Sequence, residues 1–175
     1  MEIEKLRETI KEYAKDIRLN LSSVLTVEGA PGLTLAQIYG TALACSCYTK
    51  RDVLKDALTQ DAKDHLTPEW IEAAKSAATI MAMNNIYYRF THLVTDPEFK
   101  KLPARLRMSV IGKPGIEKAD FELMCLAVSA LEGCSACVNS HTEEVKKAGM
   151  SLEAIQSSVR IASVINATAQ AISIG

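Results

Sequence analysis

The sequence predicts a single all-α domain, residues 1–175, of about eight helices. Alanine is abundant, only 5% of the residues are aromatic, and no window is dominated by the β-branched and aromatic residues typical of strands. Apolar residues recur at steps of three and four, as they do on one face of a helix. A chain of 175 residues, 48% of them hydrophobic, is long enough to bury a substantial core.

The first part of the chain contains three expected helices. The second, at about residues 34–48, is nearly all apolar and is therefore expected to be buried, and the third spans about 52–65 with Asp52 as its cap. The first runs from about residue 2 to 19, with lysine, arginine and glutamate filling the polar face. Its apolar stripe consists of Ile3, Leu6, Ile10, Tyr13 and Ile17.

A fourth helix is expected from about residue 67 to 91. Thr67-Pro68-Glu69 combines a hydroxyl cap, a proline at the first helical position and an acid in the first turn, which is typical of a helix start. Asp96-Pro97 then breaks the chain, and residues 103–110 are expected to form a short helix.

Three helices complete the chain, at about residues 119–131, 134–149 and 151–172. Gly133 separates the first two, Gly149 is a typical C-terminal glycine, and Ser151 caps the last. The sequence also suggests a weak internal repeat, about 34–91 and 118–173. In that alignment, Thr67-Pro68-Glu69 corresponds to Ser151-Leu152-Glu153, and the first half has no cysteine pair.

Charge and hydropathy exclude several classes of protein. The net charge is −1, with both signs mixed throughout, so no basic stripe indicates a nucleic-acid or membrane-surface partner. The N-terminus lacks the apolar segment of a signal peptide, and no uncharged apolar run is long enough to span a membrane. We therefore expect a cytoplasmic location, where a Cys-x-x-Cys pair indicates catalysis or metal binding.

Gly133-Cys134-Ser135-Ala136-Cys137, followed by His141, is the stretch that carries chemistry. On a helix, Cys134, Cys137 and His141 share one face at steps of three and four. Thiols in the first turn of a helix are favoured as thiolates, and a nearby imidazole accepts a thiol proton. Glu122, on the preceding helix, is placed to orient His141 if the two helices pack antiparallel. This pattern predicts a thiol redox centre with a Glu, His and Cys proton relay.

Two other interpretations remain open on spacing alone. The first is plain core packing of the two cysteines. The second is a zinc site, with Cys134, Cys137 and His141 as ligands and Glu122 as the fourth.

The remaining candidates are interpreted as structural. Cys45 and Cys47 point to different faces of one helix and are expected to be buried, and Cys125 is expected in the core although it lies three residues after Glu122. Met81 and Met108 are expected core filler. Asn84-Asn85 lies inside an apolar helix, where buried amides need partners, so this pair is expected to brace neighbouring helices or a subunit contact.

Several stretches taken together resemble the alkyl hydroperoxidase D (AhpD) family, within the wider carboxymuconolactone-decarboxylase-like group. The resemblance covers nearly the whole chain, and its most specific part is Glu122, the Cys134-x-x-Cys137 pair and His141 in this order and spacing. The other matching stretches are Glu12 to Leu21, Met83-Asn84-Asn85-Ile86-Tyr87-Tyr88-Arg89, and Leu106-Arg107-Met108 on to Pro114-Gly115-Ile116.

The resemblance implies an AhpD-like helical fold, a homo-oligomer (typically a trimer) and an antioxidant thiol peroxidase that acts on alkyl hydroperoxides. By analogy, Cys137 would be the peroxidatic cysteine, deprotonated through His141 and Glu122 and oxidised to a sulfenic acid. Cys134 would then donate its own proton or react through its own thiol, and a disulfide between Cys134 and Cys137 would form.

The resemblance also implies partners, but no tightly bound cofactor and no metal. Lipoyl groups would act as external reductant, presented as dihydrolipoyl groups on the acyltransferase of a 2-oxoacid dehydrogenase complex. The protein would in turn regenerate an AhpC-type peroxiredoxin, which requires Cys134 to be exposed. Well-known members carry a histidine just before the second cysteine, where this chain has Ala136, so a proton-relay role for that side chain is absent here.

The sequence thus predicts a lipoyl-dependent alkyl hydroperoxide reductase. The alternatives are a zinc-binding or non-catalytic structural oligomer of the same fold, and a disulfide reductase with little direct peroxidase activity.

Overall fold

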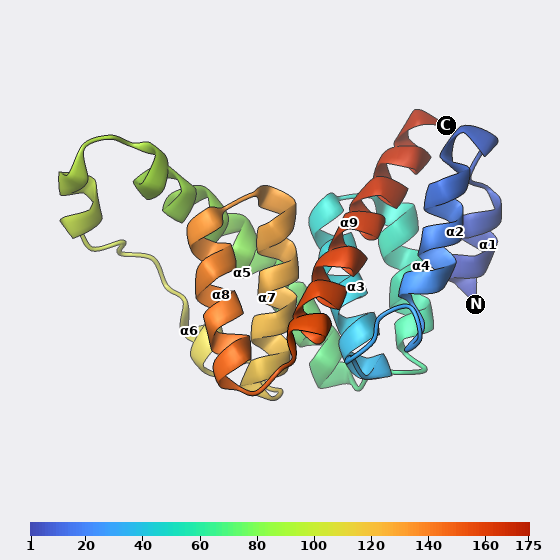
Figure 1. Cartoon of the computed structure of the whole chain (residues 1–175), viewed down its shortest axis with the longest axis horizontal. Coiled ribbons are helices and arrows are strands. Elements are labelled where there is room, and N and C mark those ends of the chain that lie inside the picture. The colour runs from blue at the N-terminus through green and yellow to red at the C-terminus, as the bar shows by residue number, and fades with distance from the viewer.

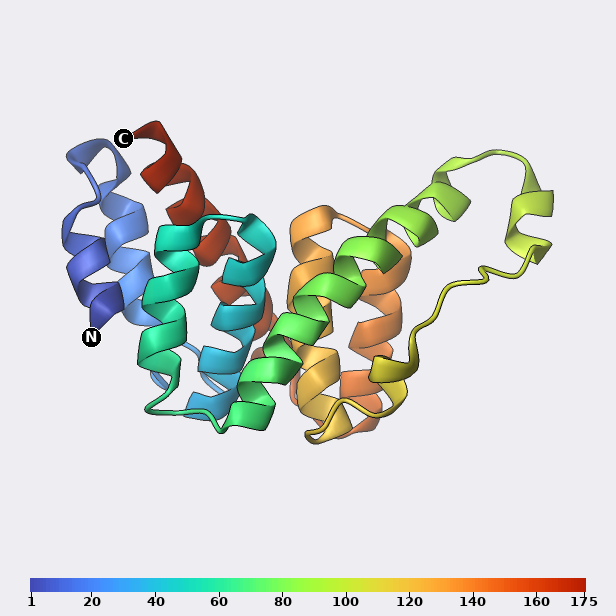
Figure 2. The same ribbon diagram turned by 180° about the vertical axis from the view of Figure 1, so that it is seen from behind.

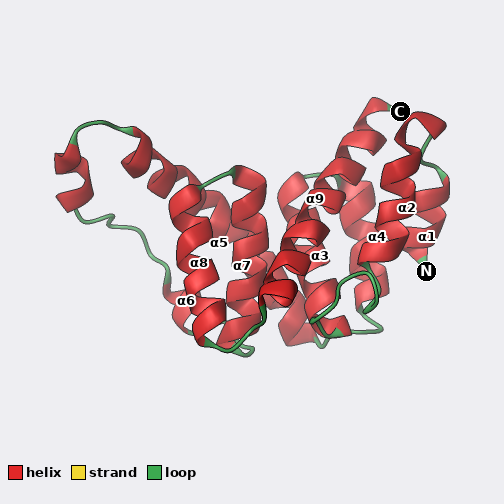
Figure 3. Ribbon diagram, in the orientation of Figure 1, coloured by secondary structure: helices red, strands yellow, loops and turns green.

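The computed structural model describes all of residues 1–175, and every regular element in it is a helix (Figure 3). Two short 3-10 helices are η1 (Glu12–Ala14) and η2 (Pro97–Lys101). The α-helices are α1 (Glu2–Glu8), α2 (Lys15–Val24), α3 (Leu35–Thr49), α4 (Asp52–Ala62), α5 (Pro68–Leu93), α6 (Ser109–Gly112), α7 (Lys118–Glu132), α8 (Ser135–Lys147) and α9 (Leu152–Ile174). The predicted all-α class is therefore confirmed.

Two buried helices, α3 and α7, lie at the centre of the domain. Residues 38–46 of α3 and 121–129 of α7 are buried without interruption, as the apolar sequence of α3 predicts. α3 packs against α4, α5, α7 and α9, whereas α7 packs against α5, α8 and α9. Small residues permit this close packing: a Cβ added at Gly40 of α3 would come within 3.0 Å of the Trp70 ring.

The predicted first helix is wrong as a single element, which is why there are nine α-helices rather than about eight. The chain turns after α1, and Lys11 is extended before η1 begins. The break leaves Tyr13 57% exposed, off the expected apolar stripe, and its hydroxyl donates to the Ala171 carbonyl of α9 at 2.8 Å. It also lets α2 pack against α9 while α1 packs against α4.

A buried carboxylate on α4 anchors the N-terminus of α1. Asp61 accepts hydrogen bonds from the backbone N–H groups of Glu2 and Ile3, at 2.7 and 2.8 Å. These are two of the donors that a helix start leaves unpaired, so the capping acid comes from a distant helix instead of the local sequence.

The other predicted caps hold only in part. Ser151 caps α9 through the Ala154 N–H, whereas Thr67 is the N-cap residue of α5 but its side chain makes no capping hydrogen bond. Thr34 and Gln37 form a reciprocal capping box on α3 that was not predicted. Asp52 is the first residue of α4, whose N-cap is Arg51. The short helix expected at 103–110 is wrong: residues 103–108 have no regular secondary structure, and only α6 is helical there.

An arm projects away from the helical body. It consists of the end of α5, η2 and the irregular chain that follows η2. Figures 1 and 2 show this arm (residues 86–107) reaching out on the side of α8 and returning through α6 to α7. Both chain termini lie at the opposite end of the molecule (Figure 1). No helix combines the length and the apolar character needed to cross a membrane. The predicted internal repeat stays a prediction.

Candidate active site

The turn between α7 and α8 places both cysteines of the pair. Gly133 ends α7 with φ 69°, a left-handed conformation that glycine adopts without steric cost. Cys134 follows as the N-cap of α8, and its Sγ accepts a hydrogen bond from the Cys137 N–H at 3.3 Å. The expected placement of both sulfur atoms at the start of a helix is therefore observed.

Cys134 and Cys137 are joined by a disulfide bond. Cys134 is completely buried, whereas Cys137 is 7% exposed and lies on the wall of a cavity. The Sγ of Cys137 is 4.0 Å from the backbone carbonyl oxygen of Asn84 on α5. Any molecule that approaches from the cavity therefore meets the Cys137 sulfur first.

His141 and Glu122 form a buried pair between α8 and α7. The His141 Nδ1 lies 2.5 Å from Glu122 Oε2, and the two side chains are 10% and 4% exposed. An Nδ1–H that donates to this carboxylate leaves the lone pair of a neutral ring on Nε2, the nitrogen that can exchange a proton. Nε2 lies 3.2 Å from Met81 Sδ, a packing contact, because neither atom carries a proton in this tautomer.

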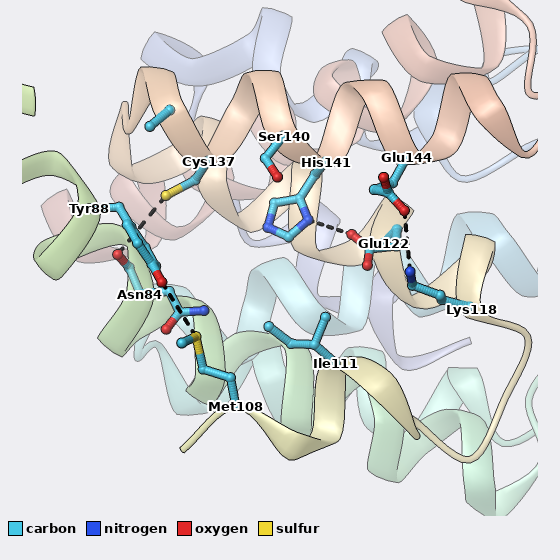
Figure 4. A pocket seen from close by; sticks show the side chains of 11 residues that line it. Asn84, Tyr88, Met108, Ile111, Lys118, Glu122, Cys137, Ser140, His141 and Glu144 are labelled. Atoms are coloured by element: carbon cyan, nitrogen blue, oxygen red, sulfur yellow. Dashed lines mark hydrogen bonds and ion pairs between the residues drawn. The ribbon is translucent and has the colours of Figure 1, made fainter. Parts of the chain in front are cut away.

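The cavity has a volume of about 430 Å³ and is lined by four separate segments of the chain. Figure 4 shows the His141 ring between Cys137 and Glu122, with Asn84 and Tyr88 of α5 on the facing side. The complete lining consists of Asn84, Tyr88, Met108, Ile111, Lys118, Glu122, Ala136, Cys137, Ser140, His141 and Glu144.

The wall of the cavity combines apolar and charged groups. Met108, the N-cap of α6, and Ile111 of α6 supply apolar surface, and the Tyr88 hydroxyl contacts Met108 Sδ at 3.8 Å. Lys118 pairs with Glu144 at 3.2 Å. Hydrogen bonds from Lys147 and then Lys118 lower the pKa of the Glu144 carboxyl. The cavity can therefore hold a small molecule with an apolar body beside the reactive sulfur.

A second polar cluster fixes the end of α7 just before the cysteine pair. The guanidinium of Arg89 donates to the backbone carbonyl of Glu132 at 2.8 Å and pairs with its carboxylate at 2.8 Å. The Tyr48 hydroxyl also donates to that carboxylate. Burial and this hydrogen bond raise the pKa of Tyr48 to about 12. Helices α3, α5 and α7 are thereby tied together next to Gly133.

The four predicted site residues, Cys134, Cys137, His141 and Glu122, lie together. The other cysteines stay outside: Cys45 and Cys125 are completely buried, Cys47 is half-buried, and all three are free thiols. Burial, and then the charge of Glu122, raises the pKa of the Cys125 thiol. No group of three or more His, Cys, Asp or Glu side chains is arranged to hold a metal ion.

The facing wall from α5 was not predicted as part of the site. Met81 contacts His141 and Met108 lines the cavity, so neither is mere core filler. Asn85 does brace neighbouring helices, because its Oδ1 accepts from Ser129 of α7 at 3.0 Å, but Asn84 lines the cavity. Met81, Asn84 and Tyr88 follow one another at steps of three and four, the helical spacing that could have identified this wall.

Comparison with known proteins identifies relatives along nearly the whole chain. Residues 97–174 match the carboxymuconolactone decarboxylase family. The chain is 50% identical to the alkyl hydroperoxide reductase AhpD of Rhodospirillum centenum, over 97% of this chain and 89% of that protein. It is 46% identical to the protein of the same name from Azorhizobium caulinodans, over 98% of this chain and 93% of that protein. It is 48% identical to the protein of the same name from Streptomyces griseus, over 95% of this chain and 93% of that protein.

Proposed function

This chain belongs to the alkyl hydroperoxide reductase AhpD family, and we propose that it is an antioxidant enzyme that reduces alkyl hydroperoxides to alcohols. The observation that carries the proposal is the Cys134–Cys137 disulfide on the wall of a cavity that also contains the His141–Glu122 pair. Peroxide reduction needs a thiol that can be oxidised, a base that takes its proton and room for the substrate, and these three features lie together here.

The reaction begins from the reduced pair. His141, oriented by Glu122, takes the proton of Cys137, and the thiolate attacks the terminal oxygen of R–O–O–H. The O–O bond breaks, Cys137 becomes a sulfenic acid, and an alkoxide leaves and is protonated to the alcohol. The Cys134 thiol then displaces the sulfenic hydroxyl as water, which forms the disulfide.

We propose dihydrolipoyl groups, carried by the acyltransferase of a 2-oxoacid dehydrogenase complex, as the external reductant. A dithiol gives two electrons and two protons to the disulfide and becomes a cyclic disulfide itself. Because Cys134 is completely buried and Cys137 borders the cavity, the incoming thiolate attacks the Cys137 sulfur and releases Cys134. An AhpC-type peroxiredoxin would likewise exchange with Cys137. The expectation that Cys134 is exposed for this exchange is wrong, because Cys134 is completely buried.

Location and assembly are further parts of the proposal. Three free cysteines beside one disulfide are compatible with a reducing cytoplasm. The arm exposes a series of large apolar side chains, which supports burial against other copies of the chain in a homotrimer. These residues are Ile86, Phe90, Leu93, Phe99 and Leu102.

The test is turnover of an organic hydroperoxide by the purified protein, with dihydrolipoamide, thioredoxin and glutathione compared as electron donors. We expect Cys137→Ser to abolish peroxide consumption and Cys134→Ser to leave a sulfenic acid that dimedone traps on Cys137. Sulfenic acid trapped on Cys134 would reverse the two roles. Reduction of a peroxiredoxin disulfide without peroxide consumption would indicate a disulfide reductase. A tightly bound stoichiometric zinc, with no oxidisable thiol pair, would overturn the redox assignment.

A further inference from the structure

We propose that Asn84 is a further catalytic residue, whose side-chain amide donates a hydrogen bond to the alkoxide that leaves when the Cys137 thiolate attacks a hydroperoxide. The inference rests on the proposed function and adds a role for the wall that faces the reactive sulfur. It concerns the step in which the O–O bond breaks, when negative charge moves from the Cys137 sulfur to the oxygen bonded to carbon.

The leaving oxygen needs a donor because an alkoxide is a strong base. A fixed hydrogen-bond donor near this oxygen stabilises the transition state more than it stabilises the neutral peroxide. His141 Nδ1 is engaged by Glu122, and its Nε2, which has taken the thiol proton, returns that proton to the alkoxide. A second, fixed donor stabilises the negative charge on the oxygen before this proton is transferred.

Asn84 lies where this donor is required. Its backbone carbonyl oxygen is 4.0 Å from the Cys137 Sγ, and its side chain lines the cavity on the wall opposite α8. The residue is only 4% exposed. In Figure 4 the Asn84 amide nitrogen is turned toward the middle of the pocket, on the side of His141.

The amide of Asn84 has no structural partner to explain its burial. Its Oδ1 is shielded from solvent and accepts no hydrogen bond, although buried amides are normally paired. The neighbouring Asn85 is held by one hydrogen bond, which its Oδ1 accepts from Ser129, and its unpaired Nδ2 lies outside the cavity. An unpaired polar side chain retained beside a reactive sulfur is more simply explained by a ligand than by packing.

Other donors around the cavity are less suitable. Lys118 and Ser140 are exposed to solvent, and Lys118 is paired with Glu144 at 3.2 Å. The Tyr88 hydroxyl is directed to Met108 Sδ at 3.8 Å. Apart from His141, which acts through its transferred proton, Asn84 is the lining residue that combines burial, an amide without a hydrogen-bond partner and proximity to Cys137. We therefore assign to Asn84 the second hydrogen bond to the developing alkoxide.

The experiment compares how the fully reduced protein and its Asn84→Ala and Asn84→Asp variants react with three reagents. tert-Butyl hydroperoxide releases a strongly basic alkoxide, peracetic acid releases a weakly basic carboxylate, and iodoacetamide releases iodide, which needs no donor. We expect the second-order rate constant for tert-butyl hydroperoxide to fall on the order of 10- to 100-fold in Asn84→Ala. The rate constant for peracetic acid falls much less, and alkylation of Cys137 is unchanged.

The ratio of the hydroperoxide rate constant to the peracid rate constant, measured within each variant, does not depend on the fraction of folded protein. Asn85→Ala is the matched control, a buried amide on the same helix outside the cavity, and it keeps the wild-type ratio. Equal losses with all three reagents, or no loss with tert-butyl hydroperoxide, would overturn the role of Asn84 while the peroxidase assignment stands. A wild-type protein that reduces neither peroxide would overturn the proposed function itself.

Discussion

Glu122 Oε2 and His141 Nδ1 lie 2.5 Å apart, although 19 positions separate the two residues in the sequence and they belong to different helices. The pair is almost completely buried, with side chains 4% and 10% exposed. A buried carboxylate and imidazole stabilise each other only at such close range, because each would otherwise lose hydration without compensation. Their contact therefore orients the ring next to Cys137, as the proposed role of His141 as a proton acceptor requires.

Replacement of Glu122 tests this orientation. We expect Glu122→Gln to fold and to lower the rate of Cys137 oxidation by peroxide on the order of 10- to 100-fold, since the ring loses the charge that stabilises its protonated form. Stopped-flow measurement of peroxide consumption across pH gives the change. Glu144→Gln is the matched control, a carboxylate at the same cavity that pairs with Lys118 and Lys147. Equal rates for wild type and Glu122→Gln would remove the relay.

The five thiols of the reduced protein should differ sharply in alkylation. Burial raises the pKa of Cys45, and burial followed by the charge of Glu122 raises the pKa of Cys125, so neither forms appreciable thiolate near neutral pH. We expect iodoacetamide to modify Cys137 first and Cys47 more slowly, as burial raises its pKa as well. Cys45 and Cys125 react only after denaturation. Peptide mapping by mass spectrometry follows each site, and rapid labelling of Cys125 in folded protein would contradict the prediction.

Ala136→His places an imidazole at the cavity wall. Well-known members of the family that the sequence resembles carry a histidine at this position. An additional imidazole titrates near pH 6.5 unless its surroundings shift it, so we expect a new ionisation at about pH 6–7 in the profile of kcat/KM. The rate above that pH should rise because a second base lies beside the Cys137 thiol. Ala136→Gln, polar but without a titrating group, is the control. Identical pH profiles for the wild type and Ala136→His would show that this position is not coupled to the thiol.

Tyr48 should make the stability depend on pH in the alkaline range. Its pKa is raised from 10.0 to about 12 by burial and by its hydrogen bond to Glu132, so the folded state keeps a proton that the unfolded state loses. The contribution is fully present below pH 10 and is lost as pH rises from 10 to about 12. Denaturant unfolding at a series of pH values should show a steeper decline for the wild type than for Tyr48→Phe. Parallel curves for the two proteins would contradict this.

The arm offers a test of assembly. Leu93 on the arm is 74% exposed and Leu152, at the start of α9, is 73% exposed, so the two leucines form a matched pair. If the arm is buried in a homotrimer, Leu93→Gln weakens each interface by about 2 kcal/mol, whereas Leu152→Gln has no effect. Light scattering at decreasing protein concentration measures dissociation. A monomeric wild type, or equal masses for both variants, would contradict the trimer proposal.

Local sequence predicted most of the elements because helix signals are short-range. The run from Leu35 to Ser46, the Thr67-Pro68-Glu69 start and the glycine stop at Gly133 depend on neighbouring residues, and the structure follows them. The prediction failed where a distant contact decided the backbone. The break after α1 depends on packing against two different helices, and Asp61, which anchors the start of α1, is 59 positions from Glu2.

The order and spacing of residues were enough to predict the helical class, the Cys134 and Cys137 pair at a helix start, and the presence of His141 on the same face. These follow from spacing along one helix, where steps of three and four fix which side chains are neighbours. Three relationships became visible only in the folded molecule: Cys137, not Cys134, borders the cavity, Glu122 contacts His141, and Asn84 faces Cys137. Those relationships depend on how α5, α7 and α8 pack, and packing between helices is set by the whole core rather than by any local pattern.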